Sequence, residues 1–305
     1  MSDHLAAFEA QRTHLLGIAY RMLGEMSAAE DVAQEAWLRW QRAEGEAVRD
    51  PRAWLSAVTV RLSLDALRKA RARRETYVGP WLPEPLLPDD TRALAADAPA
   101  ARAELASDLS LALLHVLERL SPEERAALIL HDAFDCDYAT IAQALDKSEP
   151  ACRKLVSRAR ERVKSDRPRF KASDDQRRDL LMRFARASAA KDEKELLSLL
   201  APNAIAYTDG GGRVAAALNP IYGAEKIARF MVGLTRKFYT DATFDMQSIE
   251  LNGRPGMMLR ADNQLFGAVT IETDGERITA VYAVRNPDKL ERITRPTSPG
   301  SSPSA

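Results

Sequence analysis

The sequence lacks most of what a secreted, membrane-bound or metal-binding protein would need. Cys136 and Cys152 are its only cysteines, which excludes a disulfide framework and indicates a reducing compartment, the cytoplasm. No CxxC pair or histidine partner supports a metal site, so we expect no metal and no cofactor. The sequence contains no run of eighteen apolar residues, so it predicts no membrane span. Residues 1–12 lack the basic and apolar segments of a secretory signal.

Net charge is also absent, since 44 basic residues balance 44 acidic ones. This balance conceals three charged segments. Residues 61–75 carry six basic groups against two acidic ones, residues 147–171 carry ten against three, and residues 76–110 carry two against six. Two basic segments joined by an acidic connector suggest two contacts with a polyanion. Solvated helix faces would give the same composition, so the motifs must decide between these interpretations.

Helical periodicity runs through the first 75 residues. Apolar residues between Leu5 and Leu23 recur at spacings of three and four. Residues 27–30, Ser-Ala-Ala-Glu, have the pattern of a capping box and predict the start of a second helix. Asp50-Pro51 predicts the start of a third helix. Opposite its apolar stripe, the second helix presents Asp31, Gln34, Glu35 and Leu38.

Proline and glycine interrupt residues 76–105 at six positions, which excludes a long helix there. We interpret this segment as a linker. A purely flexible linker has little use for tryptophan, so we expect its apolar motif to dock on another part of the protein. That motif is WLPEP, which consists of Trp81, Leu82, Pro83, Glu84 and Pro85.

Residues 138–164 have the form of a helix-turn-helix. A capping box at residues 121–124 opens the preceding helix, residues 146–148 form the turn, and Ser148 caps the second helix. In such a motif the first turns of the second helix enter the major groove of DNA. A solvated basic helix in a plain bundle is the alternative. The residues that we predict to contact bases or phosphates are Glu149, Arg153, Lys154, Ser157, Arg158 and Arg160.

After Pro168 the pattern changes. Two short helices, predicted at 175–190 and 191–200, precede segments rich in β-branched and aromatic residues at 204–208, 257–262, 265–273 and 277–285. A further helix is predicted at 224–237. This order predicts a small α+β cone or half-barrel. The Ser- and Pro-rich residues 293–305 predict a disordered tail.

Taken together, these segments resemble the extracytoplasmic-function sigma factors of bacterial RNA polymerase. Residues 29–40 resemble region 2.2 of that family, residues 50–73 resemble regions 2.3 and 2.4, and residues 117–164 resemble region 4. WLPEP at 81–85, DGGGR at 209–213 and NPDKL at 286–290 resemble the signatures of the SigJ-like subgroup, whose members carry a fused SnoaL-like domain. One departure is Asp146, where most members have glycine; aspartate adopts a left-handed φ more readily than most residues.

The resemblance implies a multi-domain alternative sigma subunit that binds core RNA polymerase and directs initiation at promoter DNA. Its parts would be two all-α sigma domains, region 2 (1–75) and the helix-turn-helix region 4 (106–168), joined by the linker and followed by an α+β SnoaL-like cone domain (172–292). The linker would lie near the RNA exit path, and the loop before Asp50 would hold flipped bases. Region 2 would bind the polymerase clamp through Asp31, Gln34, Glu35 and Leu38. It would face DNA with Arg61, Asp65, Arg68 and Lys69.

The cone domain contains no histidine, because His131 is the last of four in the chain. An enzyme of this fold would need a histidine or carboxylate base, and Asp209, with Tyr207 beside it, is the best candidate. Because the domain has no histidine, we do not expect catalysis there. We instead expect regulation in cis, in which the cone holds the linker and region 2 and replaces a separate anti-sigma protein. The three glycines of DGGGR would let this loop approach another backbone closely, and we expect NPDKL to be an exposed motif. The cone has room for a small ligand, but no residue identifies one. Besides WLPEP, the expected contact residues are Asp209, Gly210, Gly211, Gly212, Arg213, Asn286, Pro287, Asp288, Lys289 and Leu290.

Two other functions fit parts of the sequence. One is a cone-fold enzyme fused to a DNA-binding regulator, and the other is a conventional helix-turn-helix regulator that binds duplex DNA alone. Neither would use the polymerase-facing helix of region 2. Binding to core polymerase therefore distinguishes the sigma factor from both.

Overall fold

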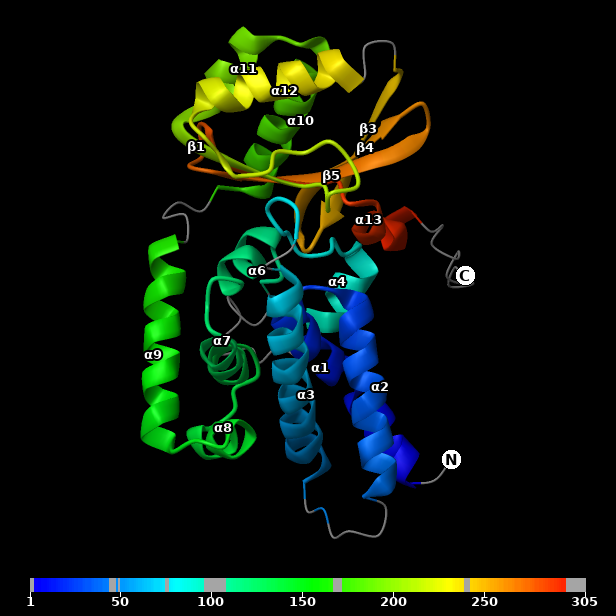
Figure 1. Cartoon of the computed structure of the whole chain (residues 1–305), viewed down its shortest axis with the longest axis vertical. Coiled ribbons are helices and arrows are strands. Elements are labelled where there is room, and N and C mark those ends of the chain that lie inside the picture. The colour runs from blue at the N-terminus through cyan, green and yellow to red at the C-terminus, as the bar shows by residue number, and fades with distance from the viewer. Residues whose placement is uncertain are drawn as a thin grey trace, which may run out of the picture.

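A computed structural model describes residues 3–43, 48, 50–74, 77–95, 108–166, 172–238 and 242–294, with only the backbone of 3, 71–74 and 166. Part of the loop before Asp50, residues 76 and 96–105 of the predicted linker, the end of the second basic segment and the tail from residue 295 lie outside these ranges. Within the described ranges, no helix combines the length and apolar character that crossing a membrane requires. Figure 1 shows a helical half joined to an α+β half.

The N-terminal helices are α1 (Asp3–Leu23), α2 (Met26–Arg42) and α3 (Pro51–Arg74). They pack side by side through apolar faces that include Tyr20 and Leu55, both fully buried. Asp50 Oδ1 accepts the backbone N–H of Ala53 at 3.0 Å, which confirms the predicted start of α3. The short helix α4 (Pro88–Ala95) follows the WLPEP segment.

The second helical set comprises α6 (Leu111–Leu117), α7 (Pro122–Leu128), the π-helical turn η2 (Ile129–Ala133), α8 (Tyr138–Leu145) and α9 (Glu149–Asp166). The capping box of Ser121 and Glu124 forms as predicted. Asp146 ends α8 with φ 53° and ψ 51°, so aspartate does adopt the left-handed conformation that glycine usually takes. One continuous apolar core runs from α1 to α9, so the two helical sets pack on each other.

The α+β half contains α10 (Asp174–Ala190), α11 (Glu193–Leu199), α12 (Ala224–Phe238) and α13 (Pro287–Thr294). Its strands are β1 (Leu200–Asp209), β2 (Ile221–Tyr222), β3 (Phe244–Leu251), β4 (Arg254–Ala261), β5 (Gln264–Thr273) and β6 (Ile278–Val284), in the order β2-β1-β6-β5-β4-β3. β1 and β6 are parallel, and the other neighbours are antiparallel. Helices α10 to α12 cover one face, while α13 lies where the sheet meets the helical half (Figure 1).

The predicted fold class is confirmed, but some local predictions are wrong and strands β2 and β3 were not predicted. No capping box forms at Ser27: α2 already begins at Met26, after an N-cap at Glu25 that makes no side-chain cap. Strand β3 was missed because alternating polar residues weaken its apolar signal. Ile293 and Thr294, assigned to the tail, complete α13. The predicted exposure of the NPDKL motif holds only for its second and third residues, as described below.

Candidate functional site

The predicted polymerase-facing residues share one exposed face of α2. Asp31, Gln34 and Leu38 are exposed, and Glu35 forms a 3.2 Å ion pair with Arg39 one turn later. Leu38 is 38% exposed, although it is a large apolar side chain. The opposite stripe of α2 is buried in the core. The arrangement leaves this face accessible to a partner in the structure as it stands.

Helix α9 presents its basic face to solvent because its other face is buried by Cys152, Val156, Ala159 and Val163. Ser148 Oγ accepts the N–H of Ala151 at 3.4 Å and so caps the helix. The side chains exposed along the outer face are Arg153, Lys154, Ser157, Arg158 and Arg160.

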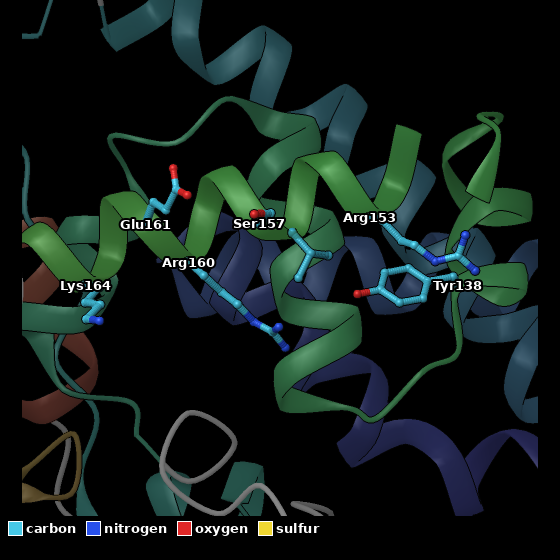
Figure 2. A pocket seen from close by; sticks show the side chains of 7 residues that line it. Tyr138, Arg153, Ser157, Arg160, Glu161 and Lys164 are labelled. Carbon is cyan, nitrogen blue, oxygen red and sulfur yellow. The ribbon is translucent and has the colours of Figure 1, made fainter. Parts of the chain in front are cut away.

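A groove along α9 is lined by two arginines with different partners, Arg153 and Arg160. Figure 2 shows Arg153 reaching toward the ring of Tyr138 on α8, where its guanidinium carbon lies 5.0 Å from the ring centroid. Its Nη2 also pairs with Glu149 at 2.8 Å. These contacts position Arg153 at the start of α9 without burying it, since its side chain is 54% exposed. Lys154, Ser157 and Arg158 are exposed as well.

Arg160 has an internal partner. It donates two hydrogen bonds to the buried carboxylate of Asp132 in η2, at 2.9 and 2.5 Å. Burial alone would raise the pKa of Asp132, but the bonds from Arg160 and His131 outweigh it and hold that pKa below its ordinary value. Arg162 likewise pairs with Glu124 at 2.8 Å. These two arginines attach α9 to the helices behind it.

The predicted DNA face of α3 is turned toward α7 and α8. Arg61 donates to the carbonyls of Gln143 and Ala144 at the end of α8, at 2.7 and 3.3 Å. Arg68 pairs with Asp65 and with Glu123 of α7, both at 3.3 Å. Lys69 is exposed. The two predicted DNA-binding surfaces therefore lie on helices, α3 and α9, that both contact α7 and α8.

WLPEP, DGGGR and NPDKL meet at one place, around Asp209. This side chain is fully buried at the end of β1. Its carboxylate accepts from the hydroxyl of Tyr77 at 2.5 Å, the backbone N–H of Leu82 at 2.9 Å and Nζ of Lys289 at 2.7 Å. We call Tyr77, Leu82, Asp209, Asn286 and Lys289 the linker–cone junction.

Lys289 completes the junction from the side of α13. Its Nζ donates to the carbonyl of Leu82 at 2.5 Å and lies 4.0 Å from the ring centroid of Trp81. Asn286 Nδ2 donates to the Tyr77 hydroxyl at 3.0 Å. Asn286, Lys289 and Leu290 are buried, which is the correction to the predicted exposure of this motif; Pro287 and Asp288 are exposed.

The glycines of DGGGR serve close approach. A Cβ on Gly211 would lie 2.5 Å from Nδ2 of Asn286, and one on Gly212 would lie 3.1 Å from Cβ of Val78. Both have positive φ, and Gly210 is equally crowded. Arg213 pairs with Asp288 at 3.2 Å, so its partner lies in the same half and not in a neighbouring domain.

The WLPEP segment also binds the first helices. Glu84 Oε2 accepts the N–H of Met26 at 2.7 Å, and the Glu84 N–H donates to the carbonyl of Gly24 at 2.8 Å. Glu84 therefore supplies the cap of α2 from 58 residues away. Burial raises the pKa of this carboxyl, although the bond from Met26 acts in the opposite direction. Pro83 and Pro85 are buried beside it, and Trp81 covers Gly24.

A second contact between the halves was missed from the sequence. Asn252, at the tip of the β3–β4 hairpin, is 1% exposed and has φ 53°. Its Nδ2 donates to the hydroxyl of Tyr20 in α1 at 2.8 Å, and its Oδ1 accepts the N–H of Leu86 at 2.9 Å. The Asn252-Gly253 pair is a hairpin-turn signal that could have located this tip. Arg292 of α13 adds ion pairs with Asp90 and Glu30.

Comparison with known proteins identifies the helical half. Residues 7–73 match the family model for Sigma-70 region 2, and residues 110–163 match that for Sigma-70, region 4. The chain is 38% identical to the ECF RNA polymerase sigma factor SigJ of Mycobacterium tuberculosis, over 97% of this chain and 98% of that protein. The chain belongs to the extracytoplasmic-function sigma factors. It is an alternative sigma subunit, which binds core RNA polymerase and directs promoter recognition.

Two further comparisons extend over the cone. The probable sigma factor SigI of Mycobacterium tuberculosis is 30% identical over 96% of this chain and 98% of its own length. The crystal structure of Mycobacterium tuberculosis SigJ superposes with a TM-score of 0.72 at 34% identity, covering 94% of this chain and 98% of that one. The α+β half is therefore shared by a sigma factor of the same family.

Proposed function

We propose that the cone domain regulates this sigma factor in cis by holding it in a closed arrangement. The observation that carries the proposal is the linker–cone junction, in which one buried carboxylate binds both the linker and Lys289. The linker supplies two donors to this carboxylate, the Tyr77 hydroxyl and the Leu82 N–H, and a hydrogen bond to a charged group contributes about 1.5–3 kcal/mol. The cone, in this proposal, serves as a regulatory module and does no catalysis.

The closed arrangement would block DNA and leave the polymerase-binding face free. Arg61 and Arg68, our proposed promoter contacts of region 2, are engaged by α8 and α7 of region 4. Asp31, Gln34 and Leu38, our proposed clamp contacts, are exposed. We therefore propose that the closed protein first binds core polymerase through α2 and that opening follows on the enzyme. No separate anti-sigma protein is then needed, and the protein would act in the cytoplasm.

The proposed DNA contacts of region 4 are Arg153, Lys154, Ser157 and Arg158, with Glu149 as an acceptor for a cytosine amine. Their exposure on α9 supports this role. Arg160 would contribute through the part of its guanidinium that is not bonded to Asp132, since its side chain is 49% exposed. Weak binding by either sigma region alone is expected, since linking two modules raises the effective concentration of the second.

A reversible covalent lock tests the proposal. A Cβ on Gly212 lies 3.1 Å from Cβ of Val78, close to the separation of about 3.8 Å in a disulfide. The variant Val78→Cys/Gly212→Cys is assayed with core polymerase, oxidised and after reduction, on a template library with randomised promoter sequences. The single variants are the controls.

We expect the oxidised double variant to bind core polymerase and to initiate poorly, and reduction to restore initiation to the level of the single variants. Full initiation by the oxidised protein would refute regulation by closure. Loss of core binding on oxidation, with initiation also lost, would refute the order in which binding precedes opening.

A further inference from the structure

The cone contains a cavity that the sigma function does not use. It lies between α10, α12 and the covered face of the sheet, with a volume of about 80 Å³. Its walls are mainly apolar and include the rings and thioethers of Phe184, Phe230, Phe266, Met231, Met246 and Met257. Methionine side chains adapt to what they contact, so such a cavity can enlarge around an apolar guest.

One charge faces this apolar space. Among the described residues that line the cavity, Arg285 alone is charged, and it is 7% exposed. Its Nη1 donates to the carbonyl of Ala215, and its guanidinium carbon lies 5.7 Å from the ring centroid of Phe266. A guanidinium in apolar surroundings binds a carboxylate strongly, through two parallel hydrogen bonds.

We propose that this cavity binds a small monocarboxylic acid with an apolar body, whose carboxylate pairs with Arg285 and whose body lies among the phenylalanine and methionine side chains. A dry cavity of about 150 Å³ holds a benzene ring. The cavity here is smaller, and we expect short-chain or single-ring acids to fit after the methionines adjust.

The cavity is joined to the linker–cone junction through the backbone. The N–H groups of Arg285 and Asn286 both donate to the carbonyl of Asp209, at 2.7 and 2.8 Å. Thr208 lines the cavity, and the next residue, Asp209, faces the linker. An acid that draws Arg285 away from Ala215 would loosen the loop that carries the DGGGR glycines. This step rests on the proposed regulation in cis, and it makes the acid an opening signal.

Binding is measured on the full chain by calorimetry without polymerase, using butyrate, hexanoate and benzoate against butanol, hexanol and benzyl alcohol. We expect at least one acid to bind about tenfold or more tightly than its alcohol, the ratio typical of a hydrogen bond to a charged group. If no acid is preferred over its alcohol, or none binds in the millimolar range, the proposal is overturned.

Two variants locate the site. A Cβ on Gly267 meets nothing nearer than 3.7 Å and lies beside Leu259 and Arg285, and we expect the two methyl groups of Gly267→Val to extend into the cavity. We expect Gly267→Val to retain the melting temperature and lose acid binding. Arg285→Gln should lose the preference for acid over alcohol, whereas Arg229→Gln on the outside of α12 should keep it. Unchanged binding by Gly267→Val overturns the proposal, whatever Arg285→Gln does to folding.

The link to the junction has its own measurement. With saturating benzoate, or the acid that binds best, we expect faster hydrogen exchange at the Leu82 amide, which donates to Asp209. If the Leu82 amide exchanges at an unchanged rate when acid is bound, the acid is not an opening signal, and only the proposed binding site stands. Acid binding without polymerase is independent of whether closure controls initiation, so the two proposals fail separately.

Discussion

Replacing Tyr77 with phenylalanine removes a single hydroxyl group from the linker–cone junction. Tyr77→Phe removes the donor to Asp209 and the acceptor of Asn286, but keeps the ring 5.3 Å from Nζ of Lys289. Burial, followed by the bond to Asp209, raises the pKa of Tyr77, so the hydroxyl stays protonated and able to donate at neutral pH. A hydrogen bond to a charged group contributes about 1.5–3 kcal/mol. At 1.4 kcal/mol per tenfold, the linker should open about 10 to 150 times more often.

Hydrogen exchange at the Leu82 amide measures that opening. This N–H donates to the same carboxylate and lies in a buried backbone, so it exchanges only when the linker leaves the cone. The protection factor at Leu82 should fall by the same factor as the opening equilibrium rises. Tyr222→Phe is the control, because Tyr222 is 60% exposed on β2. Unchanged protection in Tyr77→Phe, or an equal loss in the control, would refute the assignment of this bond to the junction.

Three further substitutions test the other contacts. Asn252→Gly keeps the positive φ but loses two buried hydrogen bonds, so the free energy of unfolding measured in urea should fall by about 1–3 kcal/mol. Asn263→Gly, in an exposed turn, should change that free energy little. Burial raises the pKa of Glu84 in the folded protein. Its contribution to the free energy of unfolding is therefore complete below the unfolded pKa of about 4.3 and declines as the pH rises through the folded pKa. The free energy of unfolding of Glu84→Gln, measured against pH, should lack that decline. Arg158→Ala should weaken promoter binding and lower its salt dependence without changing the melting temperature, while Arg160→Ala should also lower the melting temperature.

Local signals in the sequence predicted local structure well. The starts of α3 and α7 and the cap of α9 depend on a side chain that bonds to a backbone N–H three residues away, and Asp50, Ser121 and Ser148 each make that bond. The left-handed conformation of Asp146 is also a local feature, because it depends on the backbone geometry of that residue alone. Such features need no knowledge of the rest of the fold.

The failed prediction at Ser27 shows where this method stops. Residues 27–30 have the composition of a capping box, but Glu84 approaches from the linker and binds the N–H of Met26. A carboxylate fixed by packing on the first helices supplies the cap one residue earlier, and a scan of neighbouring residues cannot find it. Asn252 is a similar case, because its side chain donates to the buried hydroxyl of Tyr20, which lies 232 residues away along the chain.

The candidate site was predicted as a set of residue types, and its partners came from the structure. The basic residues of α3 and α9 were identified from charge, but charge does not distinguish a guanidinium held by Asp132 from one free to meet phosphate. The motif glycines were expected to permit close approach, and they do so at Asn286 and Val78. The sequence did not indicate that Tyr77 would bind Asp209.

In the proposed regulation, the closed arrangement uses some of the groups that promoter DNA would contact, so the equilibrium would respond to both partners. The bonds of Arg61 and Arg68 to region 4 would compete with bonds to promoter DNA. DNA that binds only the open state would stabilise it by RT ln(1 + [L]/Kd), about 2.7 kcal/mol at 100 times Kd. This is of the same size as one junction bond to a charged group. On this proposal, a junction of a few such bonds keeps the free protein closed until polymerase and promoter together open it.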